Sequence, residues 1–150
     1  MVGTTTWIRP LAEAGDDLPA HWEVSGSACR TTQGLFAAWA GALRFPDYFG
    51  HNWAAFNDCL RDALSGVGTT GGASGPATLV VREAGGLLAD EPAKALGILL
   101  SVLADHADLA GAGGGPALLL LLDDEPEPLL DLGRRLAAVG WETSIPGSGA

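Results

Sequence analysis

Several residue types are scarce in this chain of 150 residues, and each shortage argues against a class of protein. The 2 cysteines, Cys29 and Cys59, are too few for the disulfide framework of a small secreted domain. No secretory segment is recognised at the start of the sequence, so we expect reduced thiols and a cytoplasmic location. The apolar runs 95–104 and 117–122 are far shorter than the ~20 residues that span a bilayer. We therefore expect no membrane segment.

Basic side chains are also scarce. Lys and Arg together number 8 against 18 Asp and Glu, Lys94 is the one lysine, and the formal net charge is −10. Such a charge repels phosphate backbones and anionic membrane surfaces, and it favours fast encounter with basic partners. We expect no direct binding of nucleic acid, although acidity that serves solubility alone would explain the charge equally well.

Metal and phosphate motifs are missing. The histidines His21, His51 and His106 are scattered, without ligand spacing or clustered cysteines, so we expect no metal site. The glycine-rich segment 111–115 lacks the Lys-Ser/Thr pair of a phosphate-binding loop, and it precedes an expected strand instead of opening a helix. We expect no cofactor.

Strand-like and helix-like segments alternate along the chain, which predicts an α/β fold with a small parallel sheet of three strands. Expected strands are 22–24, 77–81 and 117–122. Expected helices are 31–43, the helix from Trp53 onward, 90–108 and the stretch after Pro128. A fourth strand is plausible at 141–145, whereas the first 20 residues suggest an irregular arm or a short edge strand. The apolar run 117–122 is typical of a central strand with helices on both faces.

The segment 45–60 is the most informative part of the chain. Pro46 ends the preceding helix, Gly50 permits a tight turn, and Asn52 is suited to cap the next helix. From there the large apolar residues recur at helical spacing. They are Trp53, Phe56, Leu60 and Leu64. The opposite face carries Ala54, Asn57, Asp58, Arg61 and Asp62. An aromatic loop and an outward acid thus share one edge, as in a recognition surface.

This segment resembles the signature of the barstar family of intracellular ribonuclease inhibitors. In that family a Pro, an acid, a Tyr, an aromatic, a Gly, a variable residue and an Asn lead into a helix that ends in Asp-Cys-Leu. The matching residues are Pro46, Asp47, Tyr48, Phe49, Gly50, His51, Asn52, Asp58, Cys59 and Leu60. Weaker similarity extends from about Trp22 to Asp123 and implies the same α/β fold.

The extent of the resemblance suggests how the chain is organised. It places a barstar-like domain at 21–124, preceded by an N-terminal arm at 1–20. Residues 125–150 are expected to form a helix and a candidate extra strand packed on the same domain. A length of 150 residues suits a single domain, which buries roughly 70% of the surface that its unfolded chain exposes.

The resemblance implies that the chain occludes the active site of a ribonuclease. Asp58 matches the acid that enters the cationic cleft of the nuclease, where a carboxylate can replace a phosphate. Tyr48, the one tyrosine, matches an aromatic that contacts the region of the catalytic histidine. From the residues alone, a solvated helix acid is the favoured interpretation of Asp58, and Tyr48 could be an ordinary packing residue; the resemblance reverses the preference for Asp58. The full set of expected partner contacts is Tyr48, Gly50, Asn52, Trp53, Asn57, Asp58 and Asp105.

Some positions depart from the family pattern. Ala54 stands where a second acid is expected, Asn57 replaces an aromatic, and His51 replaces an acid. Asp105 aligns, through its helical context, with a further interface acid, but a plain surface acid is an equal alternative. These departures leave less negative charge on the helix and indicate that the cognate nuclease differs.

The chain also contains residue types that could support catalysis. His51, Asp58, Cys59 and His106 are residue types used by hydrolases. Cys59, however, adjoins the inward side of its helix, which predicts a buried and inert thiol, and no nucleophile signature surrounds it. We therefore expect a protein that is not an enzyme.

The sequence as a whole predicts a cytoplasmic ribonuclease inhibitor that is a monomer when free and protects the producing cell. An alternative is an immunity or regulatory protein of the same fold that binds a different basic toxin or protein. A third interpretation is a small hydrolase that uses Cys59 or His106.

Overall fold

The computed structural model describes residues 7–14, 21–45, 50, 52–65, 77–107, 118–141, 143 and 145. Within these residues the chain forms a parallel sheet with the strand order β1-β4-β3-β2. The strands are β1 (Ile8–Pro10), β2 (His21–Ser25), β3 (Ala77–Arg82) and β4 (Leu118–Asp123). The helices are α1 (Thr32–Leu43), α2 (Trp53–Ser65), α3 (Ala93–Ala107) and α4 (Pro126–Ala138), with short 3-10 turns η1 (Leu11–Ala14), η2 (Gly26–Cys29) and η4 (Ala84–Gly86). The predicted α/β class is confirmed.

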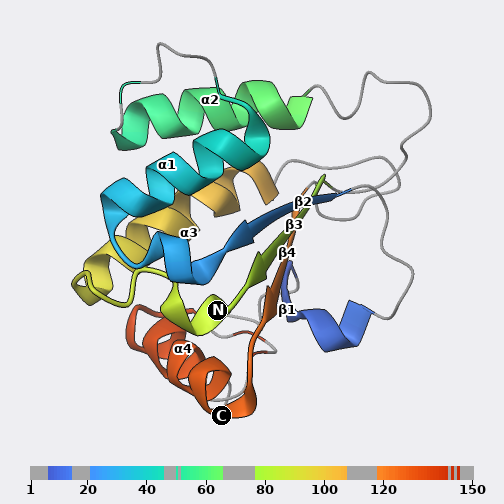
Figure 1. Cartoon of the computed structure of the whole chain (residues 1–150), viewed down its shortest axis with the longest axis vertical. Helices are drawn as coiled ribbons and strands as arrows, with labels where there is room; N and C mark the ends of the chain where they lie inside the picture. The colour runs from blue at the N-terminus through green and yellow to red at the C-terminus, as the bar shows by residue number, and fades with distance from the viewer. Residues whose placement is uncertain are drawn as a thin grey trace.

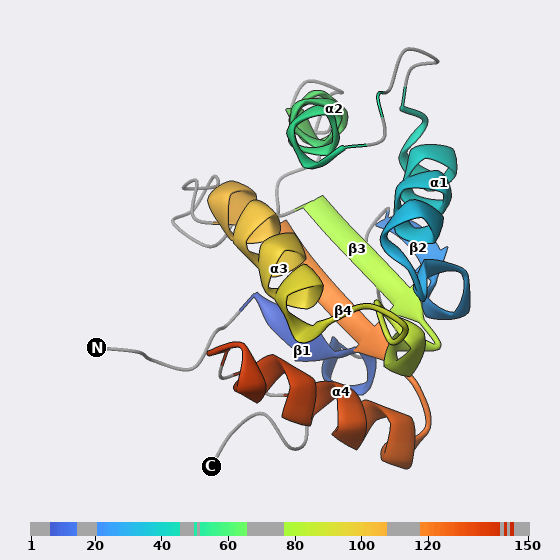
Figure 2. The ribbon, with the colours of Figure 1, turned by 90° about the vertical axis from the view of Figure 1, so that its left-hand side faces the viewer.

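The helices gather on one face of the sheet (Figures 1 and 2). Each connection from β2 to β3 to β4 moves to the next strand in the same direction. Right-handed crossovers that advance in one direction place their helices on the same face. In the part of the chain that the structure describes, the prediction that residues 117–122 carry helices on both faces is therefore wrong. On the other face η1 contacts β4, and Val80 and Leu121 are still fully buried.

The fourth strand comes from the N-terminal arm. Ile8 of β1 pairs with Leu120 of β4, so residues 8–10 add an edge to the sheet. The prediction of an extra strand at 141–145 is wrong for the residues described there, since Trp141, Thr143 and Ile145 are not in a strand. Trp141 instead packs edge-on against Trp7 with ring centroids 5.8 Å apart.

The core lies between the sheet and the helices that cover it. Leu79 and Leu120 are register partners on the helix-facing side and are 1% exposed. Above them lie the inward side chains of α1, α3 and α4, which include Leu35, Phe36, Trp39, Leu99, Leu103, Leu132 and Leu136. Each such side chain contributes about 1.5–3 kcal/mol when fully buried. Within the described part of the chain, no helix has the length and apolarity needed to span a membrane.

Candidate partner-binding site

The start of α2 is fixed by a side-chain cap. The Oδ1 atom of Asn52 accepts a hydrogen bond from the backbone N–H of Ala55 at 2.8 Å, and its Nδ2 donates to the carbonyl of Gly50 at 3.2 Å. The predicted cap is confirmed. Gly50 does not have a left-handed backbone; instead, a Cβ at that position would lie 3.2 Å from Nδ2 of Asn52. Both residues thus set where α2 begins.

An aromatic cluster holds α2 against α1. Phe56 is fully buried, and its ring lies 5.5–5.9 Å from those of Trp39, Phe36, Trp53 and Phe45. Trp53 also meets Phe36 edge-on at 5.0 Å. Aromatic pairs of this kind add about 0.5–1.5 kcal/mol each beyond their buried area. Trp53, an expected partner contact, is half-buried in this cluster, so at least part of its surface serves packing.

Asp58 projects from the outer face of α2. Its side chain is 72% exposed, as the helical spacing predicts. The nearest cation is on its own helix: Nη1 of Arg61, three residues on, lies 3.6 Å from Oδ1 of Asp58, and the Arg61 side chain is 62% exposed. An exposed pair at this spacing is worth only about 0.3–0.5 kcal/mol. Breaking this pair so that the carboxylate binds a partner would therefore cost little free energy.

Asn57 does not lie on the open face that the sequence predicts. It is half-buried and turns toward α3, where its Oδ1 lies 2.9 Å from Nε2 of His106. Because an amide oxygen only accepts hydrogen bonds, Nε2 must carry the proton. His106 is 6% exposed, and burial lowers the pKa of its imidazole. Arg61 lowers it further, and Asp105 partly offsets the shift.

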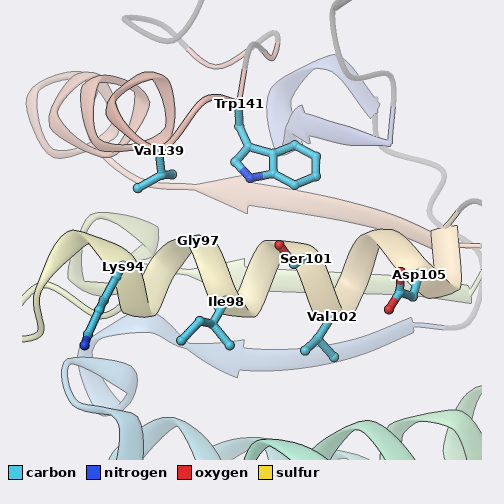
Figure 3. A pocket seen from close by; sticks show the side chains of 8 residues that line it. All are labelled: Lys94, Gly97, Ile98, Ser101, Val102, Asp105, Val139 and Trp141. Atoms are coloured by element: carbon cyan, nitrogen blue, oxygen red, sulfur yellow. The ribbon is translucent and has the colours of Figure 1, made fainter.

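Asp105 lies at the C-terminal end of α3 and is exposed. It closes one end of a shallow groove between α3 and the segment that follows α4 (Figure 3). The groove is lined by Lys94, Gly97, Ile98, Ser101, Val102, Val139 and Trp141. Asn57 precedes Asp58 and His106 follows Asp105 in the sequence, so their hydrogen bond brings together the backbones that carry the two acids. The structure therefore joins α2 and α3 at residues that adjoin two of the predicted contacts.

The cysteines do not provide a nucleophile. Cys59 is 6% exposed, and its thiol pKa is raised by burial and then by the carboxylates of Asp62 and Asp58. Burial also raises the pKa of Cys29 to about 11, with a partial offset from the indole of Trp39. Both thiols are free and buried, so they stay protonated at neutral pH. Among the described residues, no group of three or more His, Cys, Asp or Glu could hold a metal ion.

Among the expected partner contacts and the departures from the family pattern, two residues lie outside the described residues, as do Pro46, Asp47 and Phe49 of the signature. The two are Tyr48, an expected partner contact, and His51, one of the departures from the family pattern. Conversely, the hydrogen-bonding role of His106 was not predicted from the sequence, where this residue is considered only as a metal ligand or a catalyst. A signal was present: His106 falls three residues after Leu103 on the apolar stripe of its helix, where a polar group needs a partner.

The comparison with protein families extends this local picture to most of the chain. The family model described as Barstar (barnase inhibitor) matches residues 20–121. The match runs from the start of β2 into β4, so it includes α1, α2 and α3 and every predicted contact. None of the curated proteins compared with the chain matches it.

Proposed function

Because the chain belongs to the barstar family, we propose that it inhibits a ribonuclease by placing α2 and the end of α3 over the active site of the enzyme. The observation that carries this proposal is Asp58, an exposed carboxylate in the family signature on a helix that is capped and packed on its other side. We further propose that the protein acts in the cytoplasm, is a monomer when free, and needs neither catalysis nor a cofactor. Its effect would be to protect the producing cell.

The chemistry of a ribonuclease cleft suits this surface. A cleft that binds phosphate presents Arg, Lys or protonated His, and a carboxylate can accept charge-assisted hydrogen bonds from the same donors. Excluding water strengthens those bonds, provided that each buried charge is paired. Asp58 supplies such a carboxylate from α2, and Asp105 offers a second from α3. Tyr48 completes the proposed set as an aromatic anchor from the preceding loop.

The net charge supports fast association. A formal charge of −10 attracts a basic enzyme over a distance set by the Debye length, about 8 Å at physiological salt. Association with a basic ribonuclease should therefore be faster at low salt. Such steering affects the association rate more than it affects how long the complex lasts.

A second candidate function is the neutralisation of a different basic toxin or protein. Arg61 favours it, because this exposed cation lies 3.6 Å from Asp58 on the same outer face. Ala54 also favours this second candidate, since it is exposed one helical turn before Asp58 and leaves the face without the second acid of the family pattern. A surface with this mixture of charges would suit a partner that offers an acceptor beside its cationic cleft.

An inhibition assay with a parallel capture experiment separates the two candidates. The purified protein is titrated into a barnase ribonuclease assay, and the same protein, immobilised, is used to capture partners from the native cell. Inhibition of barnase, or capture of a protein with ribonuclease activity, is the expected result. Capture of a basic protein without ribonuclease activity, together with no inhibition of barnase, would favour the second candidate. Turnover of RNA by the purified protein alone would contradict both.

A further inference from the structure

We propose that His106 is a positioning residue for this surface: its hydrogen bond to Asn57 clamps α2 to α3, and protonation of the ring opens the clamp. The clamp belongs to the free chain. Its consequence for binding rests on the proposed function. The surface would then be assembled at neutral pH and loosened under mildly acidic conditions.

The geometry of the clamp is specific. Nε2 of His106 and Oδ1 of Asn57 are 2.9 Å apart although the residues are 49 positions apart in sequence. Neither side chain faces open solvent where they meet: Asn57 is half-buried, and His106, on the apolar stripe of α3, is 6% exposed. At the position where the family pattern has an aromatic, this chain therefore joins α2 to α3 by a polar contact.

The position of α2 makes this contact important. α1 and α3 lie against the sheet, whereas α2 lies beyond one end of it, above both helices (Figure 2). On the α1 side the aromatic cluster around Phe56 holds α2 in place. On the α3 side the contact with His106 is a hydrogen bond. If that bond is lost, α2 stays attached to α1 and to the core through Leu60, but the part of α2 around Asn57 is held less firmly against the end of α3 that carries Asp105.

Protonation works against the clamp through charge, because Nε2 can still donate in either form. The second proton adds a full charge and a second N–H at Nδ1, in a site with little access to water. Among the described residues, the charged groups acting on the ring are Arg61 of α2, which opposes protonation, and Asp105 of its own helix, which favours it. Burial and Arg61 prevail, and the pKa of His106 is lowered. The protonated ring is therefore best accommodated when it moves out toward water.

An ordinary core histidine would behave differently. Its protonation would weaken the whole fold, and every slowly exchanging amide would lose protection together. A clamp predicts a local effect, in which α2 loosens while the sheet and α3 keep their protection. This difference can be measured without any partner.

The test is amide hydrogen exchange of the free protein at pH 7.5 and pH 5.5, expressed as protection factors so that the intrinsic effect of pH is removed. The variants are His106→Gln, which keeps a donor for Asn57 but cannot be protonated, and His106→Ala, which removes the donor. Ser101→Ala, on the exposed side of the same helix, is the matched control. Far-UV circular dichroism checks that each variant is folded. Binding of barnase, used as the probe, is measured at both pH values with wild type and His106→Gln.

The clamp predicts that the amides of α2 in the wild type lose roughly five- to tenfold in protection at pH 5.5, as expected for one buried hydrogen bond, while those of β3 and α3 do not. His106→Gln should be insensitive to pH, and His106→Ala should show the loss at both pH values. A uniform loss across all elements, or none in α2, would overturn the clamp.

The binding measurement separates the clamp from the proposed function. If barnase binds, the affinity of the wild type should fall several-fold more between pH 7.5 and 5.5 than that of His106→Gln. Titration of barnase itself affects both measurements equally, so the difference is due to His106. An equal loss in the two would overturn the link between clamp and binding. If barnase does not bind at either pH while α2 still loosens, the clamp stands and the choice of ribonuclease, or the proposed function, is wrong.

Discussion

Replacing Asp58 by Ala should separate binding from folding. The side chain is 72% exposed and pairs with the exposed Arg61 at 3.6 Å, so its removal costs the fold no more than about 0.5 kcal/mol. Alanine also has a higher helix propensity than Asp, which offsets part of that loss. In the complex the carboxylate would be a central, desolvated anchor, and truncating such a residue to alanine weakens the binding free energy by at least ~2 kcal/mol. The inhibition constant should therefore rise about 30-fold or more.

The chain offers a closely matched control for this change. Asp131 on α4 is 75% exposed and faces Arg134 at 3.8 Å, with the same spacing of three residues as Asp58 and Arg61. α4 lies at the opposite end of the molecule from α2 (Figure 1). Asp131→Ala changes the net charge equally, so it should leave inhibition almost unchanged. Inhibition constants and urea midpoints are measured for both variants. Equal weakening by the two, or unfolding by Asp58→Ala alone, would refute the reasoning.

Other properties of the free protein can be checked directly. Phe56→Ala should lower the free energy of unfolding by ~3–5 kcal/mol in urea titrations, because the ring is fully buried among four others; a loss under 1 kcal/mol would contradict the cluster. At pH 7.5, iodoacetamide should alkylate Cys29 at least about a hundredfold more slowly than free cysteine, since its pKa is raised to about 11 and it is buried. The protection of α2 in the wild type should begin to fall as the pH drops below the ordinary histidine pKa of 6.5, because His106 in the opened state binds a proton that the closed state resists; His106→Gln should flatten this part of the curve. Asp90, whose pKa is lowered by Arg30 from 3.8, acts only at more acidic pH, so the two effects can be distinguished.

The elements that periodicity defines were predictable from the sequence. The helix expected to end at residue 43 is α1, which ends at Leu43 and is capped by Thr31, whose Oγ1 accepts from the N–H of Gly34 at 3.0 Å. The apolar runs of β3 and β4 and the outward exposure of Asp58 also follow from local spacing. In each case the signal is contained within one or two helical turns or one strand, which is why a single sequence is enough.

The features that were wrong or missed depend on distant parts of the chain. β1 has three residues, one of them proline, and becomes a strand because Ile8 meets Leu120. The one-sided covering of the sheet follows from the direction of its crossovers, which no local pattern encodes. Asn57 was expected on the open face of α2, but its amide is half-buried and accepts a hydrogen bond from the imidazole of His106 on another helix. Local patterns indicate which positions are polar and which are apolar, but the contacts that these residues make depend on the tertiary structure.

The pairing of β1 with β4 has a consequence for how the chain folds. Ile8 is synthesised before the other strands, but its partner Leu120 is made after β2 and β3 and after α1, α2 and α3. Closing so long a loop is slow, and until it closes β4 presents an open edge that contains five consecutive leucines. The nascent protein therefore passes through a stage in which its most apolar strand can pair with a neighbouring chain. Although β1 adds little area to the sheet, its pairing covers the edge of β4 and blocks such intermolecular pairing.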